Sequence, residues 1–140
     1  MSKTPEDGYT PTENEPYMNP KMLAFFRRRL LDWKEEILEE AKATIEHMKE
    51  DSSTHPDLAD RATAESERAL ELRTRDRQRK LISKIEEAIQ RIDDEEYGYC
   101  EETGEPIGIS RLMARPVATL SIEAQERHER AERTQRDEWE

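Results

Sequence analysis

The sequence predicts a mainly α protein, in which a long antiparallel coiled-coil hairpin is followed by a small globular module and a C-terminal helix. Two long stretches carry apolar residues at alternating steps of three and four, the spacing of a coiled-coil seam. Only 33% of the 140 residues are hydrophobic and 41% are charged, which leaves too few apolar residues for a large core. Three of the four glycines lie between residues 98 and 108, which indicates a turn-rich module there.

The first helix is predicted from its N-terminal signal and its seam. Residues 1–19 contain three prolines and are expected to form an extended, loosely docked arm. Asn19 before Pro20 is typical of an N-cap with proline at the first helical position, where its missing N–H costs nothing. The helix is expected to reach about Asp51. Its predicted seam consists of Leu23, Phe26, Leu30, Trp33, Ile37, Ala41, Ile45 and Met48.

The chain is expected to reverse direction at residues 51–56, a cluster of turn and capping residues that ends in a proline. Asp57 is placed to cap a second helix, with Asp60 at its N3 position, where a carboxylate is favourable. This helix is expected over residues 58–94. Its predicted seam contains Ala62, Ser66, Ala69 and Leu72, then Leu81 or Ile82, Ile85, Ile89 and Ile92.

These patterns divide the chain into four segments. They are an arm (1–19), the hairpin (20–95) with its tip near residues 51–62, a small module (96–120) and a highly charged C-terminal helix (121–140). The apolar residues expected to pack in the module are Tyr97, Tyr99, Ile107, Ile109, Leu112, Val117, Leu120 and Ile122.

The charge balance disfavours direct DNA binding, because a net charge of −11 would repel phosphates. Residues 73–80 depart from that balance, with four arginines and one lysine against one aspartate. Part of this basic island is expected to form ion pairs with Glu65, Glu67 and Glu71. No stretch approaches the ~20 apolar residues of a membrane span and no apolar leader is visible, which predicts a cytoplasmic protein.

The sequence does not predict an enzyme, since it contains no nucleophile elbow, P-loop, HExxH or dinucleotide-binding motif. Cys100 is the only cysteine, so an intramolecular disulfide is excluded. The flanking Glu101 and Glu102 are expected to disfavour its thiolate, and packing in a small core is the preferred interpretation. The three histidines are interpreted as surface or turn residues: His47, His55 and His128.

Three motifs together resemble the DksA/TraR family, with its DksA branch the most similar. They are the run DLADRA from Asp57 to Ala62, the run ELRTRDRQRKL that ends at Leu81, and Tyr-Gly-Tyr-Cys ending at Cys100. The resemblance implies a transcription regulator whose hairpin enters the secondary channel of RNA polymerase and does not bind DNA. It assigns the family's D-x-x-D-x-A tip motif, which acts on the polymerase, to Asp57, Asp60 and Ala62.

The resemblance also implies that the alarmone ppGpp is a regulatory ligand in the polymerase complex and that the pair modulates promoter complexes in the stringent response. The positions that match the family's ppGpp contacts are Leu81, Lys84 and Arg115, with Arg77 and Lys80 as neighbouring cations. Gln125 stands where the family pattern has a further lysine.

The sequence departs most from the family at its zinc site, where the pattern is C-x2-C-x17-C-x2-C. The corresponding residues here are Cys100, Thr103, Ser121 and Ala124. Structural zinc needs four Cys or His donors, whereas hydroxyls are poor ligands and a methyl group is none. A degenerate zinc-finger-like module without zinc is therefore expected, as in the cysteine-poor, zinc-independent variants of the family.

Plainer interpretations remain open for several of these residues. Asp57 and Asp60 can serve as helix caps, and Ala62 by itself indicates only good helix propensity. The alternative function is a coiled-coil adaptor unrelated to transcription, which binds a helix along its apolar seam and forms oligomers. A thiol enzyme based on Cys100 is a third and weaker hypothesis. The transcription hypothesis predicts a monomer, because the seam is closed within one chain.

Overall fold

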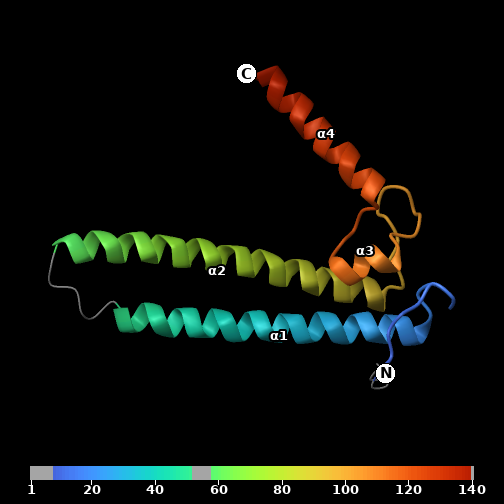
Figure 1. Cartoon of the computed structure of the whole chain (residues 1–140), viewed down its shortest axis with the longest axis horizontal. Helices are drawn as coiled ribbons and strands as arrows, with labels where there is room; N and C mark the ends of the chain where they lie inside the picture. Colours follow the sequence, from blue (N-terminus) through green and yellow to red (C-terminus); the bar gives the residue numbers. More distant parts are fainter. Residues whose placement is uncertain (1–7, 52–57, 140) are drawn as a thin grey trace. The chain divides into compact units, whose positions relative to one another are not determined.

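The computed structural model describes residues 8–51 and 58–139, and within them the fold is mainly α. The helices are α1 (Pro20–Asp51), α2 (Leu58–Asp93), α3 (Ile109–Ala114) and α4 (Ile122–Trp139) (Figure 1). The described residues contain no strand, and their single isolated β-bridge pairs Tyr99 with Pro106. None of the described helices is both long enough and apolar enough to cross a membrane. The predicted fold class is confirmed, and the ends of both long helices lie within a residue or so of their predicted positions.

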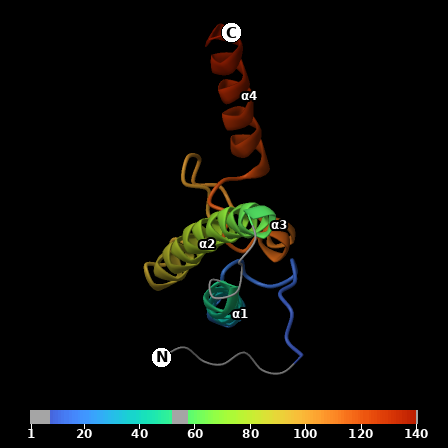
Figure 2. The same cartoon turned by 90° about the vertical axis from the view of Figure 1, so that its left-hand side faces the viewer.

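The contacts within the chain define two compact units, each described here by itself. The hairpin unit comprises Leu31–Glu87, and the core unit comprises the remaining described residues on either side of it. In the hairpin unit, α1 and α2 lie side by side and antiparallel (Figures 1 and 2). Their register is marked by Lys34 Nζ, 3.1 Å from Glu86 Oε1, and by His47 Nδ1, 2.9 Å from Glu71 Oε1.

Helix α2 begins beyond the end of α1 (Figure 1). Continuing the register of the two ion pairs places Asp51, the last residue of α1, at the level of about residue 67, because both helices rise equally per residue. Residues 58–66 of α2 thus have no helix of α1 beside them, and we call them the overhang. The predicted seam was wrong at Ala62 and Ser66, which are exposed because the overhang has no partner helix to bury them.

The seam of the hairpin unit changes from apolar to polar along its length. Ile37 and Ile85 are buried, whereas towards the start of α2 the half-buried residues include the polar Glu71, Thr74, Arg75 and Gln78. The predicted seam residues Ala69 and Leu72 are exposed, Leu72 by 49%. In this part of α2 polar side chains, and not these two residues, lie on the half-buried side of the helix. The side chain of Met48, another predicted seam residue, lies outside the described part. The remaining seam predictions in this unit are half-buried: Trp33, Ala41, Ile45, Leu81 and Ile82.

The core unit is built around aromatic and aliphatic side chains from both helices and the module. Phe26 packs against Tyr97 with ring centroids 5.6 Å apart, and the Tyr97 hydroxyl donates a 2.7 Å hydrogen bond to the Pro116 carbonyl. The fully buried large side chains among the described residues are Met22, Phe26, Leu30, Ile85, Tyr97 and Leu112, of which all but Ile85 lie in this unit. Sequence analysis missed Met22 and included Leu23, which is half-buried. It was wrong about Ile122, which is 55% exposed.

The described part of the arm, residues 8–19, docks on the core unit more extensively than the sequence predicted. Pro11 is buried, and the Tyr17 hydroxyl joins two loop segments of the module, donating to Gly98 O (2.7 Å) and accepting from Gly108 N–H (3.0 Å). The predicted N-cap is confirmed, since Asn19 Oδ1 accepts a 3.0 Å hydrogen bond from the N–H of Met22. The arm is therefore part of the packed structure at Pro11 and at Tyr17.

Candidate functional site

The overhang carries the described part of the predicted tip motif. Asp57 lies outside the described residues, and Asp60 lies in the first turn of α2 with its side chain outside the description. Ala62 is exposed, with no residue of α1 at its level. A single helix with an uncovered face can present carboxylates, a small methyl group and backbone to a partner without first separating two helices.

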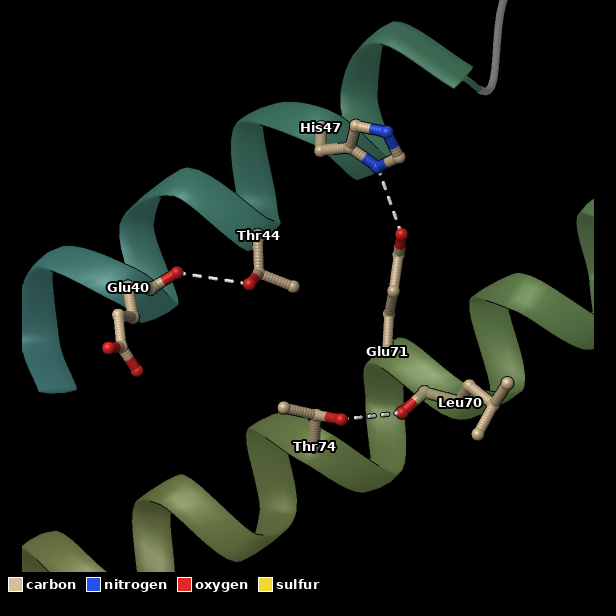
Figure 3. Close-up of polar contacts among 6 residues, drawn as sticks. All are labelled: Glu40, Thr44, His47, Leu70, Glu71 and Thr74. Carbon is tan, nitrogen blue, oxygen red and sulfur yellow. Dashed lines mark hydrogen bonds and ion pairs between the residues drawn. The ribbon is translucent and has the colours of Figure 1, made fainter.

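An open groove of about 390 Å³ lies between the two helices of the hairpin unit. The ion pair between His47 and Glu71 spans it (Figure 3). The hydroxyls of Thr44 and Thr74 do not cross the groove, because each donates a 3.0 Å hydrogen bond to the carbonyl four residues earlier in its own helix. The groove is lined by Ala43, Thr44, His47, Leu70, Glu71 and Thr74. The described residues around it include no group of three or more His, Cys, Asp or Glu that could hold a metal ion.

The surface interpretation of the histidines holds for the two that are described. The side chain of His47 is 59% exposed, and that of His128 is 50% exposed and contacts Glu102. His55 lies outside the described residues. A histidine beside a carboxylate can be held in place electrostatically. In the described part of the chain, neither imidazole belongs to a group of three or more His, Cys, Asp or Glu that could hold a metal ion.

The basic island makes fewer internal ion pairs than the sequence predicted. Glu71 contacts His47 instead of an arginine. Among the described residues, the island's ion pair is a long one between Arg79 and Asp76, at 3.8 Å. Most of its charge therefore remains available to a partner.

The three predicted ppGpp positions lie on two units. Leu81 is half-buried and Lys84 is exposed on α2, both in the hairpin unit. Arg115 is exposed in the core unit, directly after α3, where its N–H donates a 2.7 Å hydrogen bond to Arg111 O. Gln125 lies in the first turn of α4, with its side-chain amide 3.3 Å from Glu129 Oε1. Each cation is accessible on its own unit, and the assignment of the three residues to one ligand remains a prediction.

The structure brings together three of the four positions that match the family's metal-ligand pattern. Burial raises the pKa of the Cys100 thiol. Hydrogen bonds from the Thr103 hydroxyl and from backbone groups of Ser121, Thr103 and Glu102 together outweigh burial and bring this pKa down to about 6. The prediction that the thiolate is disfavoured was wrong, because these hydrogen bonds stabilise its charged form. Ala124 is fully buried, and its N–H donates to Ser121 Oγ at 3.2 Å.

Arg91 fixes the path of the chain from α2 into the module. Its guanidinium donates to the carbonyls of Glu96 (3.1 Å) and Tyr99 (2.9 Å) and to the carboxylate of Glu101 (3.0 Å). Its own carbonyl accepts from the N–H groups of Glu96 and Tyr97. Sequence analysis missed Arg91 and Tyr17, because a residue that binds backbone carbonyls and N–H groups leaves no pattern of side-chain types.

Comparison with known proteins identifies the family. Residues 22–92 match the family described as DnaK suppressor protein DksA, N-terminal domain. Residues 95–130 match the prokaryotic dksA/traR C4-type zinc finger. The chain belongs to the DksA/TraR family. This is a family of transcription factors, in agreement with the prediction that the chain is not an enzyme.

Relatives at high identity cover nearly the whole chain. A protein of Caulobacter vibrioides named RNA polymerase-binding transcription factor DksA is 63% identical over 92% of this chain and 91% of its own length. The Escherichia coli protein of the same name is 48% identical over 82% of this chain and 76% of its own length. The structure of transcription factor DksA2 from Pseudomonas aeruginosa superimposes with a TM-score of 0.78 at 42% identity, covering 84% of this chain and 90% of that one. The coiled-coil fold is thus shared with a solved member of the family.

The family match corrects the expectation that the module does without zinc. The matching family is a C4-type zinc finger, so the module belongs to a zinc-binding family and that expectation was wrong. This chain's own residues do not fit a site of four thiolates, since the matching positions supply one thiol, two hydroxyls and a methyl group. The described residues also contain no group of three or more His, Cys, Asp or Glu that could hold a metal ion.

Proposed function

We propose that this protein binds RNA polymerase and regulates transcription from promoter complexes without catalysing a reaction and without binding DNA. The observation that supports this most strongly is the 63% identity, over nine-tenths of both chains, to a factor named for RNA polymerase binding. The net charge of −11 is consistent with a protein partner, because an acidic chain is repelled by nucleic-acid phosphates. The proposed place of action is the cytoplasm.

In this proposal the tip acts in the secondary channel of the polymerase, with Asp57, Asp60 and Ala62 as the residues that affect transcription. The overhang supports the assignment, since Ala62 is exposed on a helix with no partner from α1 at its level. Carboxylates near the start of a helix can accept hydrogen bonds from basic side chains or backbone N–H groups of the polymerase. Because the motif occupies only the start of α2, changes here should affect activity more than affinity.

The test of the tip is Asp60→Asn, which preserves side-chain volume and removes the charge. Polymerase affinity should stay near normal while the effect on a ribosomal promoter falls sharply. Glu65→Gln is the matched control, because it removes the same charge from an exposed position on the overhang outside the motif. Helix content should be compared by circular dichroism, because a carboxylate removed from the first turn of a helix can itself cost about 0.3–1 kcal/mol. A fully active Asp60→Asn protein would refute the tip assignment.

We also propose that ppGpp acts with this chain on the polymerase, through the cations Lys84 and Arg115 and the apolar contact of Leu81. Both cations are exposed and so are free to meet phosphates. Lys84→Ala should reduce the ppGpp-dependent part of regulation and leave the part without ppGpp unchanged, whereas Lys84→Arg should retain most of the response. Equal loss of both parts would argue against the assignment.

The adaptor alternative differs in the state of the free protein. The helices of the hairpin unit pair with each other and bury Ile37 and Ile85, which supports a seam closed within one chain. Sedimentation over a range of protein concentrations separates the two functions. A monomer at all concentrations is expected here, and concentration-dependent oligomers would favour the adaptor.

A further inference from the structure

The two helices of the hairpin unit have no buried side chain over most of their described length. Ile37 and Ile85 are buried, but every described side chain at residues 38–47 of α1 and 61–84 of α2 is exposed or half-buried. We call these two ranges the distal hairpin. Packing of an apolar face supplies most of the stability of a helix in a protein, because a short helix alone is marginal in water. The distal hairpin therefore has little to hold its two helices together.

Gln78 lies on the inward side of the distal hairpin and weakens the pairing further. Its side chain is half-buried, and its Oε1 atom is buried without a hydrogen-bond donor in the described part of the chain. The register of the two ion pairs places Ala41 of α1 at about the same level, and a methyl group donates no hydrogen bond. A carbonyl that loses water without gaining a donor is unfavourable, so the closed pairing is destabilised at this residue.

The other polar side chains between the helices contribute few links. Thr44 and Thr74 donate their hydroxyls to carbonyls of their own helices, on either side of the open groove of about 390 Å³ (Figure 3). The ion pair between His47 and Glu71, at 2.9 Å, crosses that groove. Because the imidazole is 59% exposed, water and salt screen this pair and its contribution is small.

We infer that the distal hairpin opens and closes as a unit of its own, while the core unit and the buried Ile37 and Ile85 stay folded. Opening separates the inward side chains of α1 and α2, and the helical hydrogen bonds of both ranges are lost with it. Gln78 favours the open state, because water then reaches its Oε1 atom. The ion pair between His47 and Glu71 favours the closed state.

This device gives the hairpin two parts with different tasks. The core unit keeps its fold, and the part of the hairpin next to the tip changes its interhelical geometry at a small free-energy cost. On polymerase, the distal hairpin should adopt one closed arrangement that the partner stabilises. Only this last consequence rests on the proposed function, because the opening itself is a property of the free chain.

The first experiment is native-state amide hydrogen exchange of the free full chain, followed by nuclear magnetic resonance. After correction for intrinsic rates, the distal hairpin should exchange at least about 100-fold faster than Phe26, Leu30 and Ile92 of the core unit. Amides of 38–47 and 61–84 should report a common opening free energy. Equal protection in the distal hairpin and the core unit would overturn the inference.

The second experiment replaces Gln78 by Leu, which keeps a similar volume and removes the buried oxygen. Amides in both helices of the distal hairpin should exchange about 10-fold more slowly, since the unfavourable buried carbonyl is gone. Gln90→Leu is the matched control, because Gln90 is exposed on the same helix in the core unit, and it should change distal exchange less than about 2-fold. Slowing confined to α2, or equal slowing in the control, would overturn the inference.

A third variant moves the equilibrium in the opposite direction. Glu71→Gln removes the ion pair with His47 and should accelerate exchange in both distal ranges by about 2-fold to 5-fold, with core exchange unchanged. Glu67→Gln is its control, because it removes the same charge from an exposed position that does not line the groove. The same acceleration in both variants would show that the pair does not hold the hairpin closed.

The last experiment repeats the exchange measurement on the complex with purified polymerase. Distal amides of both helices should become protected, whereas distal amides that exchange as in the free protein would refute the closed arrangement on polymerase. Absence of any complex would refute the proposed function and leave the opening of the free chain to be judged by the first three measurements.

Discussion

Replacing Tyr17 by Phe tests whether the arm is part of the folded core unit. The change removes one hydroxyl and keeps the ring, which stacks edge-to-face on Tyr99 at a centroid distance of 5.5 Å. Two hydrogen bonds are lost, to Gly98 O and from Gly108 N–H. Each contributes about 0.5–1.5 kcal/mol net, and because the site is only half-buried the total loss should be about 1–2 kcal/mol.

The assay is urea unfolding of the full chain together with amide hydrogen exchange at Gly108, whose N–H loses its acceptor in the variant. Faster exchange at this amide and a lower free energy of unfolding are expected. Tyr9→Phe is the control, because the Tyr9 hydroxyl contacts Glu15 within the arm itself and does not join the arm to the module. Unchanged stability and exchange in Tyr17→Phe would show that the arm is not held by this tyrosine.

Three further predictions concern Gly98, Cys100 and Leu30, which all lie in the core unit. Gly98→Ala should destabilise the fold, because residue 98 has a φ of 92° and an added Cβ would lie 2.9 Å from Met18 Cγ; urea unfolding measures the loss. The Cys100 thiol should ionise near pH 6, and a pH titration of the thiolate's ultraviolet absorbance measures this pKa. As its pKa is lowered on folding, the resulting stabilisation is present above pH 9 and lost as the pH falls from 9 to about 6. Leu30→Ala should cost about 2–5 kcal/mol, whereas Leu38→Ala, at a 48% exposed position, should cost much less in the same unfolding assay.

The helical architecture could be predicted because periodicity and caps are local properties of the sequence. Asn19 and Pro20 marked the start of α1, and the buried Phe26, Leu30 and Ile37 followed from the predicted seam. The register between the helices could not be predicted, because it depends on contacts between distant residues. The overhang at the start of α2 and the polar inward face of that helix were therefore missed.

The candidate site was predictable only as far as sequence motifs extend. The tip residues and the ppGpp positions came from family motifs, and their joint geometry remains a prediction. Local geometry around the cysteine was not predictable, since the hydrogen bonds that lower the pKa of Cys100 come partly from Ser121, far along the chain. The docking of the arm by Tyr17 was missed for the same reason, because its partners are more than eighty residues away.

The most direct test of the proposed function is competition for polymerase between this chain and its Caulobacter vibrioides relative, the factor named for RNA polymerase binding. This chain carries a label at its N-terminus and is titrated with purified polymerase, after which the unlabelled relative is added. The account predicts saturable binding of one chain per polymerase and complete displacement by the relative. Absence of binding, or simultaneous binding of both proteins to one polymerase, would contradict it.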